Sequence, residues 1–256
     1  MRCRWLSVPA LLLAGVVAVG QQPGQPPPQV QVDPVKNKLD AILVNWEKAM
    51  SSLSTLYTQV KRSATDKVFL TNEVFEGEAR YIKPNKARLW LVNTDPKKQG
   101  QFEKIVVNGQ NTYIWQWKEK EILAIQMPAP KAGQVDDTNV VALLFGMKAT
   151  EAKRRYDLTL LAPPPGDTFY HYIQVLPREQ ADKSEFTRAR LVLTIATHLP
   201  AQIWFEGVNG NETTWDFRKV TPNVQLDAKD FDRPNEPGWK IQTVDPNQKA
   251  TFRSQQ

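Results

Sequence analysis

The chain has 256 residues, of which 41% are hydrophobic and 23% are charged, and its net charge at pH 7 is +6. This composition predicts a globular protein with a sizeable core, and one large domain is the simplest arrangement. The charge is too diffuse to indicate nucleic acid binding, because no basic cluster is interleaved with aromatic residues.

Residues 1–20 have the pattern of a cleaved export signal. Arg2 and Arg4 precede an apolar run, residues 11–19, that ends in the small residues of Ala18-Val19-Gly20. A membrane anchor is the alternative, but the run is shorter than the ~20 residues that a span requires. The only cysteine, Cys3, lies inside this signal, so no disulfide is expected. We expect a soluble periplasmic or extracellular protein after cleavage near Gly20.

The chain continues with a leader and one long helix. Residues 21–34 are rich in Gln and Pro and predict a disordered or extended leader. Residues 35–53 predict an amphipathic helix that packs on a sheet. Its apolar residues recur at helical spacing: Leu39, Ile42, Leu43, Trp46, Met50 and Leu53. Strands at 56–62 and 67–71 should follow.

Residues 73–126 predict an antiparallel meander, around which the rest of the domain should close. The alternation of apolar and polar residues indicates five strands, at 74–82, 87–92, 104–107, 111–117 and 121–126. Asn108-Gly109 predicts a type I′ hairpin, in which both turn residues have positive φ. Tyr113, Trp115 and Trp117 should share one aromatic face of the sheet.

The second half of the chain predicts two short helices and more strands. The apolar segment 139–145, which contains Val140, Leu143, Leu144 and Phe145, is short and should press into other elements. A helix is expected near 150–156. Strands are expected at 157–161, 168–176, 187–196, 201–208 and 212–219, the last two joined by Asn209-Gly210. After a small unit around Phe231 and 239–241, residues 242–256 should form a flexible tail, which leaves residues 35–241 as the domain.

Neither an enzyme, a metal site nor a cofactor is supported by the sequence. His171 and His198 are the only histidines, and neither has a partner at a ligand or triad spacing. Gly-rich phosphate loops and hydrolase or zinc-protease motifs are absent from the sequence. The remaining candidate is an apolar surface. Tyr113, Trp115 and Trp117 suit either core packing or the wall of a cavity for an apolar ligand.

The order of these motifs resembles the LolA/LolB-like superfamily of periplasmic lipoprotein carriers. Leu43, Trp46 and Met50 resemble its first helix, and the run from Phe75-Glu76-Gly77 to Lys83-Pro84-Asn85-Lys86-Ala87-Arg88 resembles its early strands. The hairpin at 107–115, the apolar segment 140–146 and Pro237-Gly238-Trp239 resemble later units of the family. The resemblance covers residues 35–241.

This resemblance implies an α+β fold, namely an unclosed antiparallel β-barrel of about eleven strands. An N-terminal amphipathic helix and short lid helices would cover its concave face. It further implies that Arg88 hydrogen-bonds the lid and holds the cavity shut. The alternative is an exposed arginine on the outer face, because residue parity does not fix which face is concave.

From these observations we expect a non-enzymatic, monomeric carrier or binder of a lipid-like or acylated ligand, with a membrane-associated donor or acceptor protein as a partner. The ligand wall is expected to comprise Tyr113, Trp115, Trp117, Leu89, Leu91, Val140, Leu143, Leu144 and Phe145. A sensory or structural interaction module, whose sheet face is filled by its own side chains, is the alternative.

Overall fold

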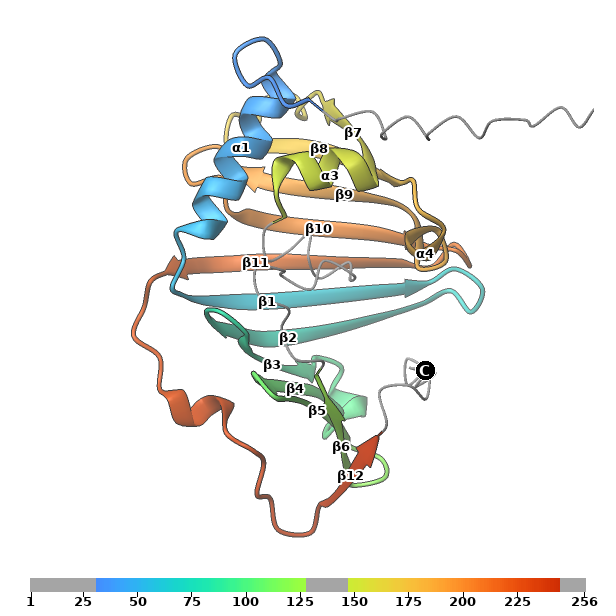
Figure 1. The fold of residues 1–256 in the computed structure, drawn as a ribbon. Helices are drawn as coiled ribbons and strands as arrows, with labels where there is room; N and C mark the ends of the chain where they lie inside the picture. Colours follow the sequence, from blue (N-terminus) through green and yellow to red (C-terminus); the bar gives the residue numbers. More distant parts are fainter. Residues whose placement is uncertain (1–30, 128–146, 245–256) are drawn as a thin grey trace, which may run out of the picture. The chain divides into compact units, whose positions relative to one another are not determined.

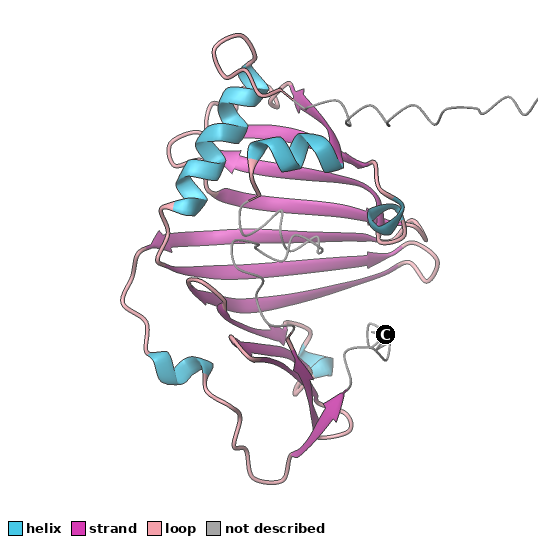
Figure 2. Cartoon of the chain, in the orientation of Figure 1, coloured by secondary structure: helices cyan, strands magenta, loops and turns pink. Residues whose placement is uncertain are grey.

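The computed structural model describes residues 31–127 and 147–244, and these form one twelve-stranded sheet with helices on it (Figures 1 and 2). The strands are β1 Thr55–Asp66, β2 Thr71–Ile82, β3 Lys86–Asn93, β4 Phe102–Asn108, β5 Asn111–Gln116, β6 Glu121–Gln126, β7 Tyr156–Leu161, β8 Tyr170–Pro177, β9 Phe186–Thr194, β10 Pro200–Gly207, β11 Glu212–Pro222 and β12 Lys240–Val244. The helices are α1 Lys38–Ser51, α3 Ala149–Arg155 and α4 Gln180–Lys183, with 3-10 turns η1 Pro96–Lys98 and η2 Ala228–Phe231.

The strand order is β12-β6-β5-β4-β3-β2-β1-β11-β10-β9-β8-β7, so within residues 31–127 and 147–244 the strands β12 and β7 form the two edges and the sheet is not closed. This confirms the predicted unclosed α+β fold. Neighbouring strands are antiparallel except for β12, which pairs with β6 in parallel. The parallel pair was not predicted. It arises because residues 223–239, hereafter the C-terminal segment, carry the chain from β11 in the middle of the sheet to its far edge.

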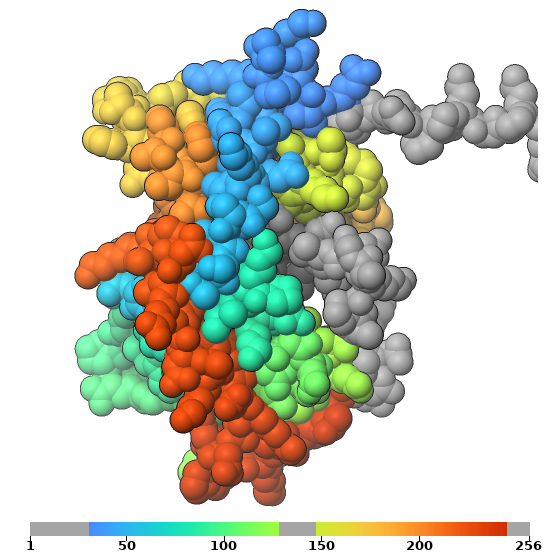
Figure 3. Space-filling view, turned by 60° about the vertical axis from the view of Figure 1, so that its left-hand side comes forward, coloured from blue at the N-terminus to red at the C-terminus, as the bar shows by residue number. Residues whose placement is uncertain are grey.

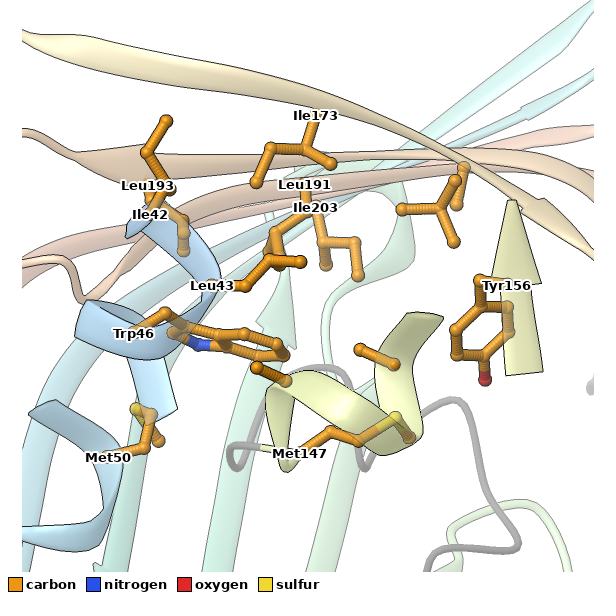
Figure 4. Packing of buried hydrophobic residues seen from close by; sticks show 14 of the residues in the cluster. Ile42, Leu43, Trp46, Met50, Met147, Tyr156, Ile173, Leu191, Leu193 and Ile203 are labelled. Carbon is orange, nitrogen blue, oxygen red and sulfur yellow. The ribbon is translucent and has the colours of Figure 1, made fainter. Parts of the chain in front are cut away.

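The main core lies between the sheet and the two helices α1 and α3. Apolar residues of α1, including Ile42, Leu43 and Trp46, pack on Ile173 of β8 and Leu191 of β9 (Figure 4). We call the sheet face that carries these helices the helix face. Met147 and Tyr156, at the two ends of α3, complete the same cluster. The predicted packing of an amphipathic first helix on the sheet is therefore confirmed.

The helix α1 is shorter than residues 35–53 because Asn37 caps it. The Asn37 side-chain oxygen accepts hydrogen bonds from the backbone N–H groups of Leu39 at 2.9 Å and Asp40 at 3.3 Å. Residues 31–34, predicted to belong to the leader, pack against this helix. Val32 contacts the core, and the Asp33 N–H donates to the buried Asp40 carboxylate at 2.8 Å. Asp40 also pairs with Lys153 of α3, which ties the two helices together.

Two turns differ from the sequence-based prediction, and a third, Asn209-Gly210, joins β10 to β11 as expected. Residues 67–70 of the expected strand at 67–71 form a turn between β1 and β2, because the Asp66 carboxylate accepts from the backbone N–H groups of Val68 and Phe69. At Asn108-Gly109 only the glycine has positive φ, so the turn is not type I′. The Asn108 side chain instead accepts from the backbone of residues 110 and 111. The Asn209-Gly210 turn behaves in the same way.

Several expectations lie outside the described residues. These are the export signal, most of the leader and the apolar segment 139–145. Residues 242–244, which were expected to belong to the tail, form part of β12, and residues 245–256 lie outside the described residues. In the described part of the chain, no helix is long and apolar enough to cross a membrane.

Candidate functional site

The residues of β5 divide between the two faces of the sheet, because side chains alternate along a strand. Tyr113 faces Val106 of β4 and Ala124 of β6, whereas Ile114 faces Ile105 and Leu123. Following this register through β3 places Leu89 opposite Ile105. On the same side as Leu89, the register continues from Leu91 across β2 to Val60 of β1 and on to Phe217 of β11. Trp215, on that side of β11, faces Ile203 of β10, which faces Leu191 under α1. Ile114 and Leu89 therefore lie on the helix face, and Tyr113 lies on the opposite face.

The aromatic residues predicted as a ligand wall lie in a second core. Tyr113 and Trp115 are 3% and 4% exposed, and they pack with Val106, Ile122 and Ala124. The C-terminal segment covers this core, since its Trp239 packs against the cluster. Figure 3 shows this part of the chain, in orange-red, lying against the green strands. Its Glu236 accepts a hydrogen bond from the Trp115 indole N–H at 3.0 Å. We call this side of the sheet the segment face.

The C-terminal segment is held to the sheet by charge as well as by packing. Arg80 of β2 and Arg88 of β3 face each other across the strand pair, and both donate to the Asp230 carboxylate in η2. The distance from Arg88 Nη1 to Asp230 Oδ1 is 3.0 Å. All three side chains are roughly three-quarters buried, so this is a partly desolvated charge cluster. Among the described residues, the buried Nε atoms of both arginines lack a hydrogen-bond partner.

This arrangement differs from the role expected for Arg88. The arginine lies on the segment face, beside η2, while Leu89 points to the helix face. Its described partner is therefore Asp230 rather than a lid helix. The segment 139–145, to which Arg88 was expected to bind, lies outside the described residues.

Lys104 lies between the rings of two tryptophans on the segment face. Its ammonium group lies 4.2 Å from the ring centre of Trp115 and 5.2 Å from that of Trp90, and it pairs with Glu236. Trp90 stacks on Phe102 with ring centres 5.3 Å apart. The segment face of β4 to β6 is thus packed by the chain's own side chains, as core residues are.

The helix face of the same strands is different. Leu91 is fully buried next to Val60 and Phe75, and beyond it the apolar residues are only half-buried. We call these half-buried residues the apolar stripe. They are Ala79 of β2, Leu89 of β3, Ile105 and Val107 of β4, Ile114 of β5, and Leu123 and Ile125 of β6. The stripe is not part of the core under α1 and α3, because the fully buried sheet residues of that core come from β7 to β10, over which the two helices lie (Figure 1).

The nine residues predicted as one ligand wall are therefore not brought together. Leu89 and Leu91 share the helix face, and Tyr113 and Trp115 share the segment face. Trp117 lies in the turn after β5, half-buried, with the Lys118 ammonium 5.4 Å from its ring centre. Val140, Leu143, Leu144 and Phe145 lie outside the described residues.

One charged pair on the helix face was missed by the sequence reasoning. Arg62 of β1 binds Glu103 of β4 through two parallel hydrogen bonds, with Nε to Oε2 at 3.0 Å. The Arg62 guanidinium lies 4.8 Å from the Phe75 ring centre and 5.8 Å from that of Trp215. Burial raises the pKa of the Glu103 carboxyl, and Arg62 opposes that rise. The available signal was parity, since Arg62 shares its side of β1 with Val60.

The two histidines, set apart in the sequence, come together in space. The rings of His171 and His198 are stacked with centres 6.1 Å apart. Burial, His198 and Lys38 together lower the pKa of His171, in that order of importance. His198 also lines an open hollow beside the C-terminal end of α1. Among the described residues, no group of His, Cys, Asp and Glu side chains is arranged to hold a metal ion.

Comparison with known proteins gives matches to solved structures only. No protein-family model matches the chain, and no curated protein matches it. An uncharacterized conserved protein from Thermus thermophilus has a TM-score of 0.48 and 11% identity, with 81% of this chain and 100% of that chain covered. A LolA superfamily protein from Nitrosomonas europaea has a TM-score of 0.34 and 10% identity, with 75% and 96% covered. The lipoprotein LppX from Mycobacterium tuberculosis has a TM-score of 0.37 and 12% identity, with 73% and 98% covered.

Proposed function

We propose that this protein is a non-enzymatic binder or carrier of a lipid-like ligand, and that the apolar stripe on the helix face of β2 to β6 holds the ligand. The observation that carries this proposal is the burial pattern of β4 to β6. On these strands the segment face is packed as a core, while the side chains that point to the helix face remain half-buried.

The stripe offers enough apolar surface for useful affinity. Burying a Leu or Ile side chain fully contributes about 1.5 to 3 kcal/mol, so completing the burial of several half-buried ones would contribute several kcal/mol before the costs of association. A dissociation constant in the micromolar range requires roughly 8 kcal/mol. An elongated apolar ligand that crosses β2 to β6 contacts enough of these side chains to approach this binding free energy, whereas a small ligand that touches two side chains does not.

Export belongs to the same proposal. The apolar run of residues 11–19 between Arg2, Arg4 and Gly20 supports secretion of the chain and removal of residues 1–20. A lipid-like molecule that crosses an aqueous compartment needs a protein that shields its chains from water. N-terminal sequencing of exported protein should give Gln21 or a neighbouring residue, and a protein that keeps Met1 after export would contradict cleavage.

The direct test is to purify the protein without detergent and to analyse an organic extract by mass spectrometry. We expect a lipid in near-stoichiometric amount. The same protein, after delipidation, should bind the neutral hydrophobic dye Nile red. Absence of both a co-purified lipid and dye binding would overturn the proposal and favour an interaction module whose sheet face is filled by its own side chains.

A pair of variants locates the binding surface. Leu123→Asn places a polar group in the stripe, and we expect it to weaken Nile red binding at least about tenfold, which corresponds to about 1.4 kcal/mol. Val92→Asn is the matched control, because Val92 is 44% exposed and points to the segment face of β3. Thermal unfolding of both variants shows whether a loss of binding reflects a loss of folded protein.

A further inference from the structure

The charged pair of Arg62 and Glu103 lies on the same sheet face as the apolar stripe. We infer that the Arg62 guanidinium receives the acidic head group of the ligand, which is therefore an anionic amphiphile: an alkyl chain that ends in a carboxylate or a phosphate. This inference rests on the proposed function and specifies the class of its ligand.

The guanidinium is held in a fixed position before any ligand arrives. Glu103 engages Nε and Nη2 through two parallel hydrogen bonds. The rings of Phe75 and Trp215 lie within 4.8 and 5.8 Å of the guanidinium carbon. An arginine fixed by a bidentate carboxylate and by aromatic neighbours loses little conformational entropy when it binds a further group.

Arg62 still has donors to offer. A guanidinium carries five N–H groups, and Glu103 accepts from two of them. In the described part of the chain, Arg62 Nη1 has no hydrogen-bond partner. Nη1 is not among the fully buried side-chain atoms that lack a hydrogen bond. The Arg62 side chain as a whole is 14% exposed, so a ligand that reaches it is largely shielded from water, where a charge-assisted hydrogen bond is strongest.

The register places the head-group site at one end of the stripe. Arg62 faces Phe75 on β2, and Glu103 faces Leu91 on β3. On β2, Gly77 lies two residues after Phe75, and on β3, Leu89 lies two residues before Leu91. Leu89 belongs to the apolar stripe and faces Ile105 on β4, where the stripe continues. A ligand with its acid group on Arg62 therefore has an apolar path for its chain directly beside it.

The ion pair is neutral overall, so the preference for an anion rests on the N–H groups of Arg62 that Glu103 leaves unbound. Glu103 is the more exposed partner, at 34%, but both of its oxygens already accept hydrogen bonds from Arg62. Glu73 lies close enough to raise the pKa of Glu103, and Lys98 binds Glu73, so the neighbouring charges also pair with each other. Of these paired groups, Arg62 is the one that still offers N–H donors on the helix face, which an acidic head group requires.

The test compares cis-parinaric acid, a fluorescent fatty acid, with its methyl ester, which has the same chain and no charge. We expect delipidated protein to bind the acid about tenfold or more tightly than the ester, as one charge-assisted hydrogen bond implies. Dodecyl phosphate and dodecanoate should displace the probe at lower concentrations than dodecanol does. The better of the two anionic competitors identifies the head group as phosphate or carboxylate.

The variant Arg62→Met removes the donor but leaves Glu103 partly buried without its partner, so the double variant Arg62→Met/Glu103→Gln is made beside it. In the double variant the preference for acid over ester should fall to about one. Arg218→Met is the control, because Arg218 is an exposed arginine on β11 that pairs with Glu76, and it should keep the preference of the unmodified protein.

The outcomes separate this inference from the proposed function. Equal affinity for acid and ester in the unmodified protein, or an acid preference that survives in the double variant, would overturn the head-group role of Arg62 and leave the stripe as the ligand site. If neither probe binds, both the inference and the proposed function are overturned.

Discussion

Gly77 of β2 lies so close to Trp90 of β3 that a β-carbon at position 77 would come 2.0 Å from the Trp90 carbonyl oxygen and 3.0 Å from the Leu91 α-carbon. Both of these atoms belong to the backbone, so no side-chain rotation relieves the contact. The side of β2 that Gly77 occupies is the helix face, where the apolar stripe begins. The glycine thus permits the close approach of two strands at this point.

We therefore expect Gly77→Ala to destabilise the protein by about 2 kcal/mol or more, because β2 and β3 must move apart to accept the new methyl group. Chemical denaturation measures the change in the free energy of unfolding. Gly207→Ala is the matched control, since a β-carbon there would meet the Asn209 side-chain oxygen at 3.0 Å, and a side chain can turn away. Equal stability of the two variants would contradict the close backbone contact.

The attachment of the C-terminal segment gives a second prediction. Asp230→Asn removes the charge shared by Arg80 and Arg88; Arg80 keeps its ion pair with Glu78, whereas the partly buried Arg88 loses its described carboxylate partner. We expect a loss of about 1 to 3 kcal/mol in the free energy of unfolding. The exposed Asp232 provides the control variant Asp232→Asn, which should change stability little. If protease cleavage within residues 223–239 increases in Asp230→Asn but not in Asp232→Asn, the loss of stability arises from detachment of the C-terminal segment.

The placement of Trp115 in a core separates it from the stripe. Trp115→Ala should cost about 3 to 5 kcal/mol of stability, because it leaves a cavity and removes the partner of Glu236. Ile114→Ala, one residue away on the other face, should cost clearly less, because Ile114 is only half-buried. Denaturant unfolding of the two variants gives the comparison. A larger loss for Ile114→Ala would mean that the helix face, not the segment face, is the packed side of β5.

The lowered pKa of His171 predicts a pH dependence of stability. Its folded pKa lies below the ordinary value near 6.5, so the unfolded chain binds a proton more readily than the folded protein does. Stability is therefore unaffected by this group above that value and falls as the pH drops below it. We expect His171→Gln to lose less thermal stability between pH 8 and pH 5 than the unmodified protein. An identical loss in both proteins would show that His171 does not contribute.

Local sequence patterns determined which segments form strands, since an alternation of apolar and polar residues is a property of neighbouring residues. The strands of the central sheet lie within a few residues of the positions expected from residues 73–126. The pattern also separated Tyr113 and Ile114 onto opposite faces. The first helix followed from helical spacing in the same way, with its start set by the Asn37 cap.

Only the tertiary structure decided which face of β5 is covered and by what. The C-terminal segment has no periodic pattern, and its anchors Asp230 and Glu236 meet Arg88 and Trp115 across more than a hundred residues of chain. An aromatic strand face suits a core and a ligand wall equally well, because both bury apolar surface. The pairing of Arg62 with Glu103 also required the tertiary structure, because Arg62 is on β1, Glu103 is on β4, and β2 and β3 lie between these strands. Alternation fixes the two sides of a strand, whereas the identity of the covering layer depends on contacts between residues that are far apart in sequence.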